Sequence, residues 1–292
     1  MSKLSNTSYY LPNPSAWPLI GSIALFCIMF GGINWLHHET FGPYLFATGF
    51  SILIFMMFGW FSTVIRESRS GLYDAQVDRS YRWGMAWFIF SEVMFFSAFF
   101  GALFYVRMWA VPWLAGEDGY NVNVYLIWQN FKAQWPLFQN PNNDVFVAAK
   151  SVMNTWGLPA LNTLILLTSG VTITIAHWGL VKNKRKQLII GLFFTILLGV
   201  TFLFCQAHEY MEAYFEKGLT LSSGIYGTTF FCLTGFHGLH VTIGTLMLIV
   251  IFFRCCFGHF DKDHQFAFEA VSWYWHFVDV VWLFLFVFVY WL

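Results

Sequence analysis

The stretch LIIGLFFTILLGVTFLFCQA, from Leu188 to Ala207, indicates the fold class of this chain. It contains no charged residue, and as an α-helix it is long enough to cross the roughly 30 Å hydrocarbon core of a bilayer. Of the 292 residues in the chain, 58% are hydrophobic and only 10% are charged, whereas a soluble domain is about 25% charged. A globular fold in water cannot cover so much apolar surface. The composition therefore predicts an all-α, polytopic membrane protein.

Further stretches of the same kind bring the predicted number of membrane-spanning helices to seven. They are expected near residues 16–35, 43–65, 83–109, 157–181, 188–207, 226–253 and 266–292. We predict one membrane domain over residues 1–292, with a long external loop over about 110–156. Short apolar pieces of this loop, at 124–128 and 145–149, are expected at the membrane surface or against a partner because they cannot span a bilayer.

The basic residues lie mostly on one side of this topology. The side shared by the N-terminal tail and the segments after the second, fourth and sixth helices carries Lys3, Arg66, Arg69, Arg79, Arg82, Lys182, Lys184, Arg185, Lys186, Arg254 and Lys262. The opposite side carries Arg107, Lys132, Lys150 and Lys217. Basic loops stay cytoplasmic, which predicts a cytoplasmic N-terminus and an external C-terminus. The formal net charge is zero, so nothing indicates a nucleic-acid partner.

Glu92 is expected near the middle of the third helix, about 15 Å along the axis from Arg82. A carboxyl group at that depth should be protonated or paired, because desolvation disfavours its charged form. One interpretation is a proton-handling or carbodiimide-reactive group; the other is a neutral carboxyl that joins two helices by a hydrogen bond. We favour the second interpretation, in which Glu92 takes no direct part in chemistry.

Other polar residues in the predicted helices fall into three groups. They are Glu209 and Glu212 near the external end of the fifth helix, His237 and His240 in the sixth, and Glu269, His276 and Asp279 in the seventh. Carboxylates and imidazoles can bind metal or haem iron, but the spacings lack the second set of ligands that such sites use. We therefore expect interhelical hydrogen bonds, including a pair between His276 and Asp279.

Several long motifs resemble subunit III of the haem–copper cytochrome c oxidases. They follow the family's order over nearly the whole chain, at residues 13–19, 64–68, 91–96, 161–163, 169–174, 229–241 and 268–282. The seven helices fit this family too, because the related subunits of quinol oxidases and nitric-oxide reductases resemble only the last five.

The resemblance implies a role and a set of partners. Helices 1–2 (about 16–65) and helices 3–7 (about 83–292) would form two bundles around a cleft that holds phospholipid. The chain would have no haem or copper of its own, since partner subunits hold both. It would stabilise catalytic subunit I of a proton-pumping oxidase, support proton uptake and prevent inactivation during turnover in aerobic respiration. Subunit II is a further expected partner, a small subunit IV is a candidate, and cytochrome c would dock on the complex.

The resemblance also assigns residues. Those expected to handle protons are Glu92, which matches the family's carbodiimide-reactive glutamate, and Glu67, Asp74 and Asp78 around the loop after the second helix. Those expected to face lipid head groups are Arg66, Arg254 and His259. Tyr73 replaces a histidine that the family often has in that loop. The external loop is longer than in mitochondrial members, which favours a bacterial plasma membrane with a periplasmic C-terminus.

Two other classes of function compete with this interpretation. A stand-alone transporter or proton channel would use Glu92 and the intramembrane histidines, but the chain lacks the inverted repeats that many transporters have. A membrane metalloenzyme is disfavoured by the ligand spacings.

Overall fold

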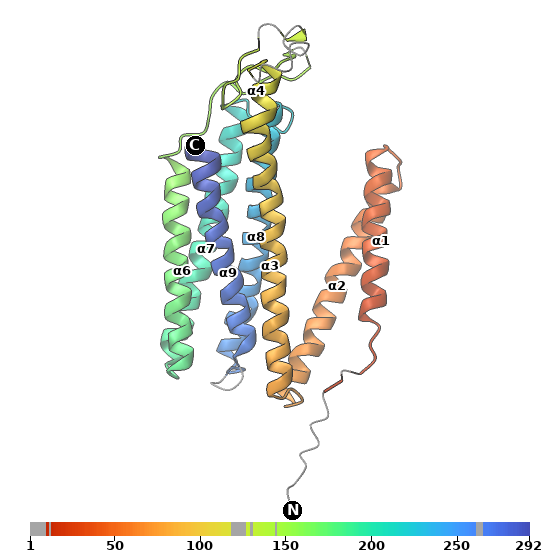
Figure 1. Ribbon diagram of the computed structural model, residues 1–292. Helices are drawn as coiled ribbons and strands as arrows, with labels where there is room; N and C mark the ends of the chain where they lie inside the picture. Colours follow the sequence, from red (N-terminus) through yellow and green to blue (C-terminus); the bar gives the residue numbers. More distant parts are fainter. Residues whose placement is uncertain (1–9, 12, 118–126, 129–130, 144, 261–264) are drawn as a thin grey trace, which may run out of the picture. The chain divides into compact units, whose positions relative to one another are not determined.

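The computed structural model describes residues 10–11, 13–117, 127–128, 131–143, 145–260 and 265–292 (Figure 1). Within these residues every regular element is a helix, and seven helices are long and apolar enough to cross a membrane. The predicted all-α, polytopic membrane fold is confirmed. Lys3 and Lys262, which entered the topology prediction, and residues 124–126 of the external loop lie outside the described residues.

The seven spans follow the predicted order. They are α1 (Trp17–Leu36), α2 (Gly42–Arg69), α3 (Ala75–Tyr105) continued by η1 (Val106–Ala110) and α4 (Val111–Leu114), α6 (Leu158–Val181), α7 (Arg185–Phe215), α8 (Ile225–Cys256), and α9 (Phe266–Leu285) continued by η2 (Phe286–Trp291). The third and fifth spans extend well beyond the predicted apolar runs. A helix satisfies its own backbone hydrogen bonds, so it can continue into the polar region where the apolar run stops.

Local sequence explains several helix ends. A proline stands in the first turn of α1, α2, α4 and α6, where the missing N–H costs nothing. Basic residues occupy the last turns of α2 and α8, where they oppose the partial negative charge of the helix C-terminus.

The chain divides into two compact units, Met1–Tyr81 and Arg82–Leu292. In the first unit α1 packs against α2. The contact is close because glycines face the neighbouring backbone: a Cβ on Gly49 would lie 2.7 Å from the backbone nitrogen of Ile28, and one on Gly31 would overlap the backbone of Phe46. Small residues at a helix crossing allow this approach in membranes.

In the second unit α6 packs against α7 and α9, and α8 packs against α7 and α9. The helices α6 and α7 are antiparallel, with Gly179 beside Leu188 and Thr172 hydrogen-bonded to Thr195. The core contains the fully buried rings of Trp275 and Trp282 on α9.

The outward surface of the helices is apolar. Phe58 on α2, Trp87 on α3 and Phe204 on α7 are 71%, 65% and 73% exposed. Large exposed apolar surface of this kind requires lipid or a partner protein, which agrees with helices of membrane-spanning length.

Candidate functional site

A carboxyl–imidazole pair joins α3 to α8. His240 Nε2 lies 2.9 Å from Glu92 Oε2, and His240 Nδ1 lies 2.6 Å from the backbone carbonyl oxygen of Phe236. A carbonyl oxygen only accepts hydrogen bonds, so Nδ1 carries a hydrogen. Nε2 then either accepts a proton from the neutral carboxyl or donates one to the carboxylate. Glu92 and His240 therefore share one proton across a single short contact.

Aromatic rings surround this pair. The rings of Phe96 and Phe95 lie 5.0 and 5.9 Å from the His240 ring, and the Tyr274 ring stacks on it at 6.4 Å. Apolar surroundings of low dielectric strengthen a hydrogen bond. The Glu92 side chain keeps 21% of its surface exposed, which leaves an approach for a small reagent.

An ionic cluster links α3, α6 and α9 at the end of the bundle where α9 begins. Arg82 Nη1 forms a salt bridge with Glu269 Oε2, and His177 Nε2 lies 3.7 Å from Glu269 Oε1. The Arg82 guanidinium also lies over the Phe266 ring, and the His177 ring stacks on Phe268 at 5.6 Å. The sequence alone suggested only one use for Arg82, as one of the basic residues that predict the orientation of the helices. Comparing the depths of the charges in the three helices would have suggested this pairing.

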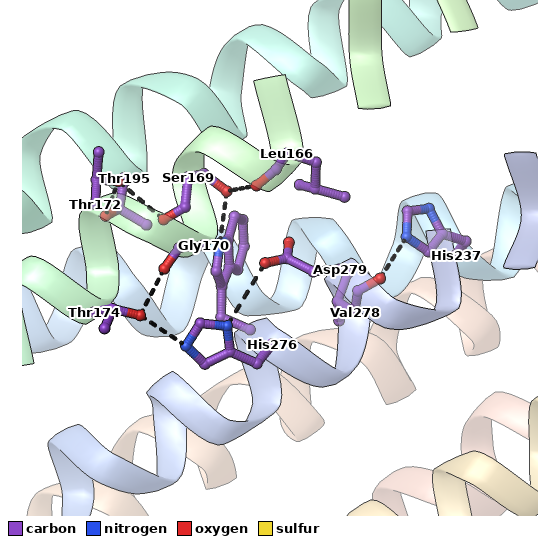
Figure 2. A network of polar contacts seen from close by, with 11 residues as sticks. Leu166, Ser169, Gly170, Thr172, Thr174, Thr195, His237, His276, Val278 and Asp279 are labelled. Atoms are coloured by element: carbon purple, nitrogen blue, oxygen red, sulfur yellow. Dashed lines mark hydrogen bonds and ion pairs between the residues drawn. The ribbon is translucent and has the colours of Figure 1, made fainter. Parts of the chain in front are cut away.

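Figure 2 shows a further network between α6 and α9. His276 Nδ1 lies 3.8 Å from Asp279 Oδ2, and His276 Nε2 lies 3.4 Å from the Thr174 hydroxyl, which donates to the Gly170 carbonyl at 2.8 Å. The structure thus brings together the two residues that the sequence predicted as a pair. A Cβ on Gly170 would lie 2.5 Å from Asp279 Oδ2, so a larger residue here would displace the Asp279 carboxyl group.

The same network contains two residues that sequence reasoning did not select. The Trp275 indole N–H donates to the Ser169 hydroxyl at 2.9 Å, and that hydroxyl donates to the Leu166 carbonyl at 2.6 Å. The Trp275 ring is completely buried. A buried indole N–H generally has a partner, so the tryptophan was a signal that a polar group lies opposite it on another helix.

His237 joins α8 to α9. Its ring is fully buried, and its Nε2 lies 3.2 Å from the backbone carbonyl oxygen of Val278 (Figure 2). The Trp282 ring lies 5.0 Å from the His237 ring. Since Nε2 faces a carbonyl oxygen, it carries the hydrogen and donates it. A nitrogen in that state has no free lone pair for a metal.

The two glutamates of the fifth span differ in their surroundings. Glu209 is fully buried, and its carboxyl oxygens make no hydrogen bond of normal geometry with a described residue, although the Tyr290 hydroxyl lies near them. Glu212 Oε1 lies 3.5 Å from Lys217 Nζ, in the connection that follows α7. Glu212 thus contacts the next loop in this structure, whereas an interhelical contact was expected. The continuation of α7 beyond the apolar run brings Lys217 within its reach.

Around the turn between α2 and α3, the acidic residues take part in local structure. Tyr73 donates from its hydroxyl to Glu67 Oε2 at 2.9 Å, and Asp74 Oδ1 accepts from the backbone N–H of Val77 at 2.8 Å. Asp74 therefore caps the N-terminus of α3, and Asp78 lies in its first turn. Burial, with the nearby Tyr81 and Glu67, raises the pKa of Tyr73, so this hydroxyl stays a hydrogen-bond donor.

The predicted lipid-facing residues lie at two helix ends. The Arg254 guanidinium lies 4.4 Å from the Phe260 ring centre, and the His259 backbone N–H donates to the Arg254 carbonyl at 3.0 Å. These two basic side chains thus belong to one helix end, that of α8. Arg66 is exposed in the last turn of α2, which belongs to the first unit.

No three side chains of His, Cys, Asp or Glu gather closely enough to hold a metal ion in the described part of the chain. The contacts found instead are hydrogen bonds and ion pairs between helices. These contacts can pair helices, and the Glu92–His240 contact can also share a proton.

Comparison with known proteins relates the whole chain to one family. A family model described as "Cytochrome c oxidase subunit III" matches residues 7–117 and 143–292. The chain is 44% identical to cytochrome c oxidase subunit 3 of Hippopotamus amphibius over 285 residues, which covers 97% of each protein. It is 43% identical to that of Drosophila melanogaster over 292 residues, covering 100% of this chain and 99% of the relative. The corresponding protein of Marchantia polymorpha is 41% identical over 292 residues, covering 100% of this chain and 98% of that protein.

Proposed function

This chain belongs to the cytochrome c oxidase subunit III family. We propose that, as a multi-pass membrane subunit of this respiratory oxidase, it supports the catalytic subunit and carries out no redox chemistry itself. It packs against and stabilises subunit I, in a complex that also contains subunit II and a small subunit IV. Haem and copper reside in those partners, and cytochrome c docks on the complex. This chain supports proton uptake, holds phospholipid and limits inactivation during turnover.

The observation that supports a proton-linked role most directly is the Glu92–His240 pair. The pair holds one proton in either of two forms, a neutral acid with a neutral imidazole or a carboxylate with an imidazolium. Both forms have zero net charge, so moving the proton within the pair does not place an isolated charge in a low-dielectric region. Glu67, Asp74 and Asp78, around the α2–α3 turn, are carboxylates that can collect protons from water.

Lipid binding is supported by the basic groups at helix ends. Arg254 and His259 lie together at the end of α8, and Arg66 is exposed at the end of α2. An arginine guanidinium presents a planar fork of N–H donors that suits phosphate oxygens. We propose that these residues hold phospholipid head groups.

We place the protein in a bacterial plasma membrane, with a cytoplasmic N-terminus and a periplasmic C-terminus. The charge distribution supports the orientation. Residues 118–142, inside the long loop, fall outside the two segments that match the family model, as an insertion relative to the family would. Fractionation of the source cells tests the location, and recovery of the protein in mitochondria would contradict it.

The proton-linked role is tested with Glu92→Gln in the purified oxidase. We expect an assembled complex that still reduces oxygen, with slower proton uptake or fewer turnovers before inactivation, because the amide cannot exchange the shared proton. A labelled carbodiimide, which attacks carboxyl groups, should modify the native chain and fail to modify this variant. Glu216→Gln, at an exposed site just after α7, is the matched control.

Two results would contradict this assignment. Native proton uptake and native lifetime in Glu92→Gln would show that the pair only joins helices. A complete loss of oxygen reduction in an intact complex would show that Glu92 takes part directly in catalysis. The lipid proposal is tested in the same preparations with Arg254→Ala, which should lower the bound phospholipid per complex; unchanged phosphorus content would contradict it. Lys186→Ala, an exposed basic site at the start of α7, is the control.

A further inference from the structure

Four buried polar side chains in the second unit make no hydrogen bond of normal geometry with the residues that the structure describes. Asn162 and Glu209 are completely buried, and Gln206 and Tyr290 keep only 5% and 8% of their surface exposed. Both amide atoms of Asn162 and Gln206, both carboxyl oxygens of Glu209 and the Tyr290 hydroxyl make no hydrogen bond of normal geometry with a described residue, although the Tyr290 hydroxyl lies near the side chains of Glu209 and Gln206. These groups come from α6, α7 and η2.

The fold brings these groups to one level of the bundle. Gln206 and Glu209 are one turn apart on α7, and the Tyr290 hydroxyl lies close enough to both to interact electrostatically. The antiparallel register of α6 and α7, set by Gly179 beside Leu188 and Thr172 beside Thr195, places Asn162 level with Gln206.

A backbone contact holds η2 near the start of α6. The Thr155 hydroxyl, just before α6, donates to the Tyr290 carbonyl at 2.5 Å. The side chain of Tyr290 therefore belongs to the same end of the bundle as Asn162. The Glu92–His240 pair is made by other helices, α3 and α8, and shares no residue with this cluster.

Leaving so many groups unsatisfied would be very costly. A buried donor or acceptor without a partner loses its hydrogen bonds to water and gains none in return, so the cluster as a whole would strongly destabilise the fold. No salt bridge to Glu209 is present among the described residues. The acidic group that acts on Glu209 electrostatically is another glutamate, Glu212. A carboxylate buried without a cation is also unfavourable.

We propose that Asn162, Gln206, Glu209 and Tyr290 form a binding site for a small cluster of water molecules inside the bundle. Each water both donates and accepts hydrogen bonds, and a buried water generally makes about three. Amide N–H groups and the tyrosine hydroxyl donate to it, and the amide oxygens accept from it. Glu209 is a neutral carboxyl that donates its proton to one of these waters. The site does not depend on the proposed role of Glu92.

The test is infrared spectroscopy of the purified oxidase complex in H2O and D2O. Relative to the native complex, Glu209→Gln should lose a carbonyl band of a protonated carboxyl group. In the native complex that band should shift after transfer to D2O, since waters exchange the proton. Glu216→Gln, at the exposed site after α7, should change only the bands of an ionised carboxylate.

Three outcomes would overturn the proposal. The first is loss of an ionised-carboxylate band in Glu209→Gln, which would show that Glu209 is charged. The second is a Glu209 band that depends on added Na⁺ or Ca²⁺, which would show a cation held by these oxygen atoms. The third is a high-resolution map of the complex in which the four side chains bond directly to one another with no water density between them. Such a map with water density on Glu209 and Gln206 would support the site even where a variant fails to assemble.

Discussion

At the scale of single residues, two pairs of polar groups within the spans join different helices. Glu92 on α3 meets His240 on α8, and Glu269 on α9 meets Arg82 on α3. An average hydrogen bond between membrane helices contributes only about 0.6 kcal/mol. Removing one member of a buried ion pair costs more, about 3–5 kcal/mol, because the remaining charge has no partner. The pairs therefore determine which helices meet more than they determine total stability.

Gly170 provides a test at this scale. In Gly170→Ala the new methyl group would lie 2.5 Å from Asp279 Oδ2 and 3.6 Å from His276 Nδ1. We expect the crowding to separate α6 from α9 locally and to destabilise the chain by roughly 1–3 kcal/mol. Thermal unfolding of the purified complex, followed by release of this subunit, measures the effect.

The control is Gly238→Ala on α8, where an added Cβ meets no atom within 4 Å. It should leave the release temperature unchanged or raise it slightly, because alanine favours a helix over glycine. Equal effects of the two substitutions would show that the Asp279 contact does not require a glycine.

At the scale of elements, the pairing of α1 with α2 depends on backbone proximity. Few residues of α1 are buried; they are Gly21, Ala24 and Gly31. Without a hydrophobic driving force between helices in lipid, close van der Waals packing at small residues holds such pairs together. The two helices are joined by a short connection, which further favours an antiparallel pair.

Substitutions at two adjacent glycines of α1 separate the effect of steric crowding from the effect of replacing a glycine by an alanine. In Gly31→Ala the new Cβ would overlap the backbone of Phe46, whereas in Gly32→Ala it would make ordinary contacts, at 3.6 and 3.7 Å, with the Phe46 ring. We expect Gly31→Ala to weaken the pair by about 1–3 kcal/mol and to speed hydrogen exchange in α1 and α2. Gly32→Ala should keep native exchange rates. Native exchange in both variants would contradict the close-packing account.

At the scale of the whole molecule, the distribution of charge predicts how the seven spans are oriented. The exposed stretch from the end of α6 into the first turn of α7 carries Lys182, Lys184, Arg185 and Lys186, and the long loop between α4 and α6 carries the exposed Lys132. Basic residues are retained on the cytoplasmic side during insertion. The predicted orientation rests on the loops alone and requires no knowledge of how the helices pack.

Trypsin accessibility tests the orientation. In inside-out vesicles we expect cleavage within 182–186 and protection at Lys132; in right-side-out spheroplasts the pattern should be reversed. Mass spectrometry of the fragments identifies the sites, and permeabilised vesicles, in which both sites are accessible, are the control. Cleavage within 182–186 from the outside of intact spheroplasts would invert the proposed topology.

The helices and their order could be predicted from the sequence, because the free energy of placing an apolar run in a bilayer depends on composition and length alone. The run from Leu188 to Ala207 was sufficient to indicate a span. The need for partners at Glu92 and Asp279 was also predictable, since desolvation makes an unpaired polar group costly wherever it lies. The helix ends were less well predicted, because helices continue past the apolar run into polar surroundings.

The identity of most partners was decided only by the tertiary structure. His276 and Asp279 could be paired from spacing because they lie on one helix, one turn apart. His240 was not predicted for Glu92, nor Arg82 for Glu269, because these contacts join residues far apart in sequence. The cluster of Asn162, Gln206, Glu209 and Tyr290 is of the same kind. A contact between helices depends on the rotation, depth and register of both, and these are fixed by the packing of all the helices together.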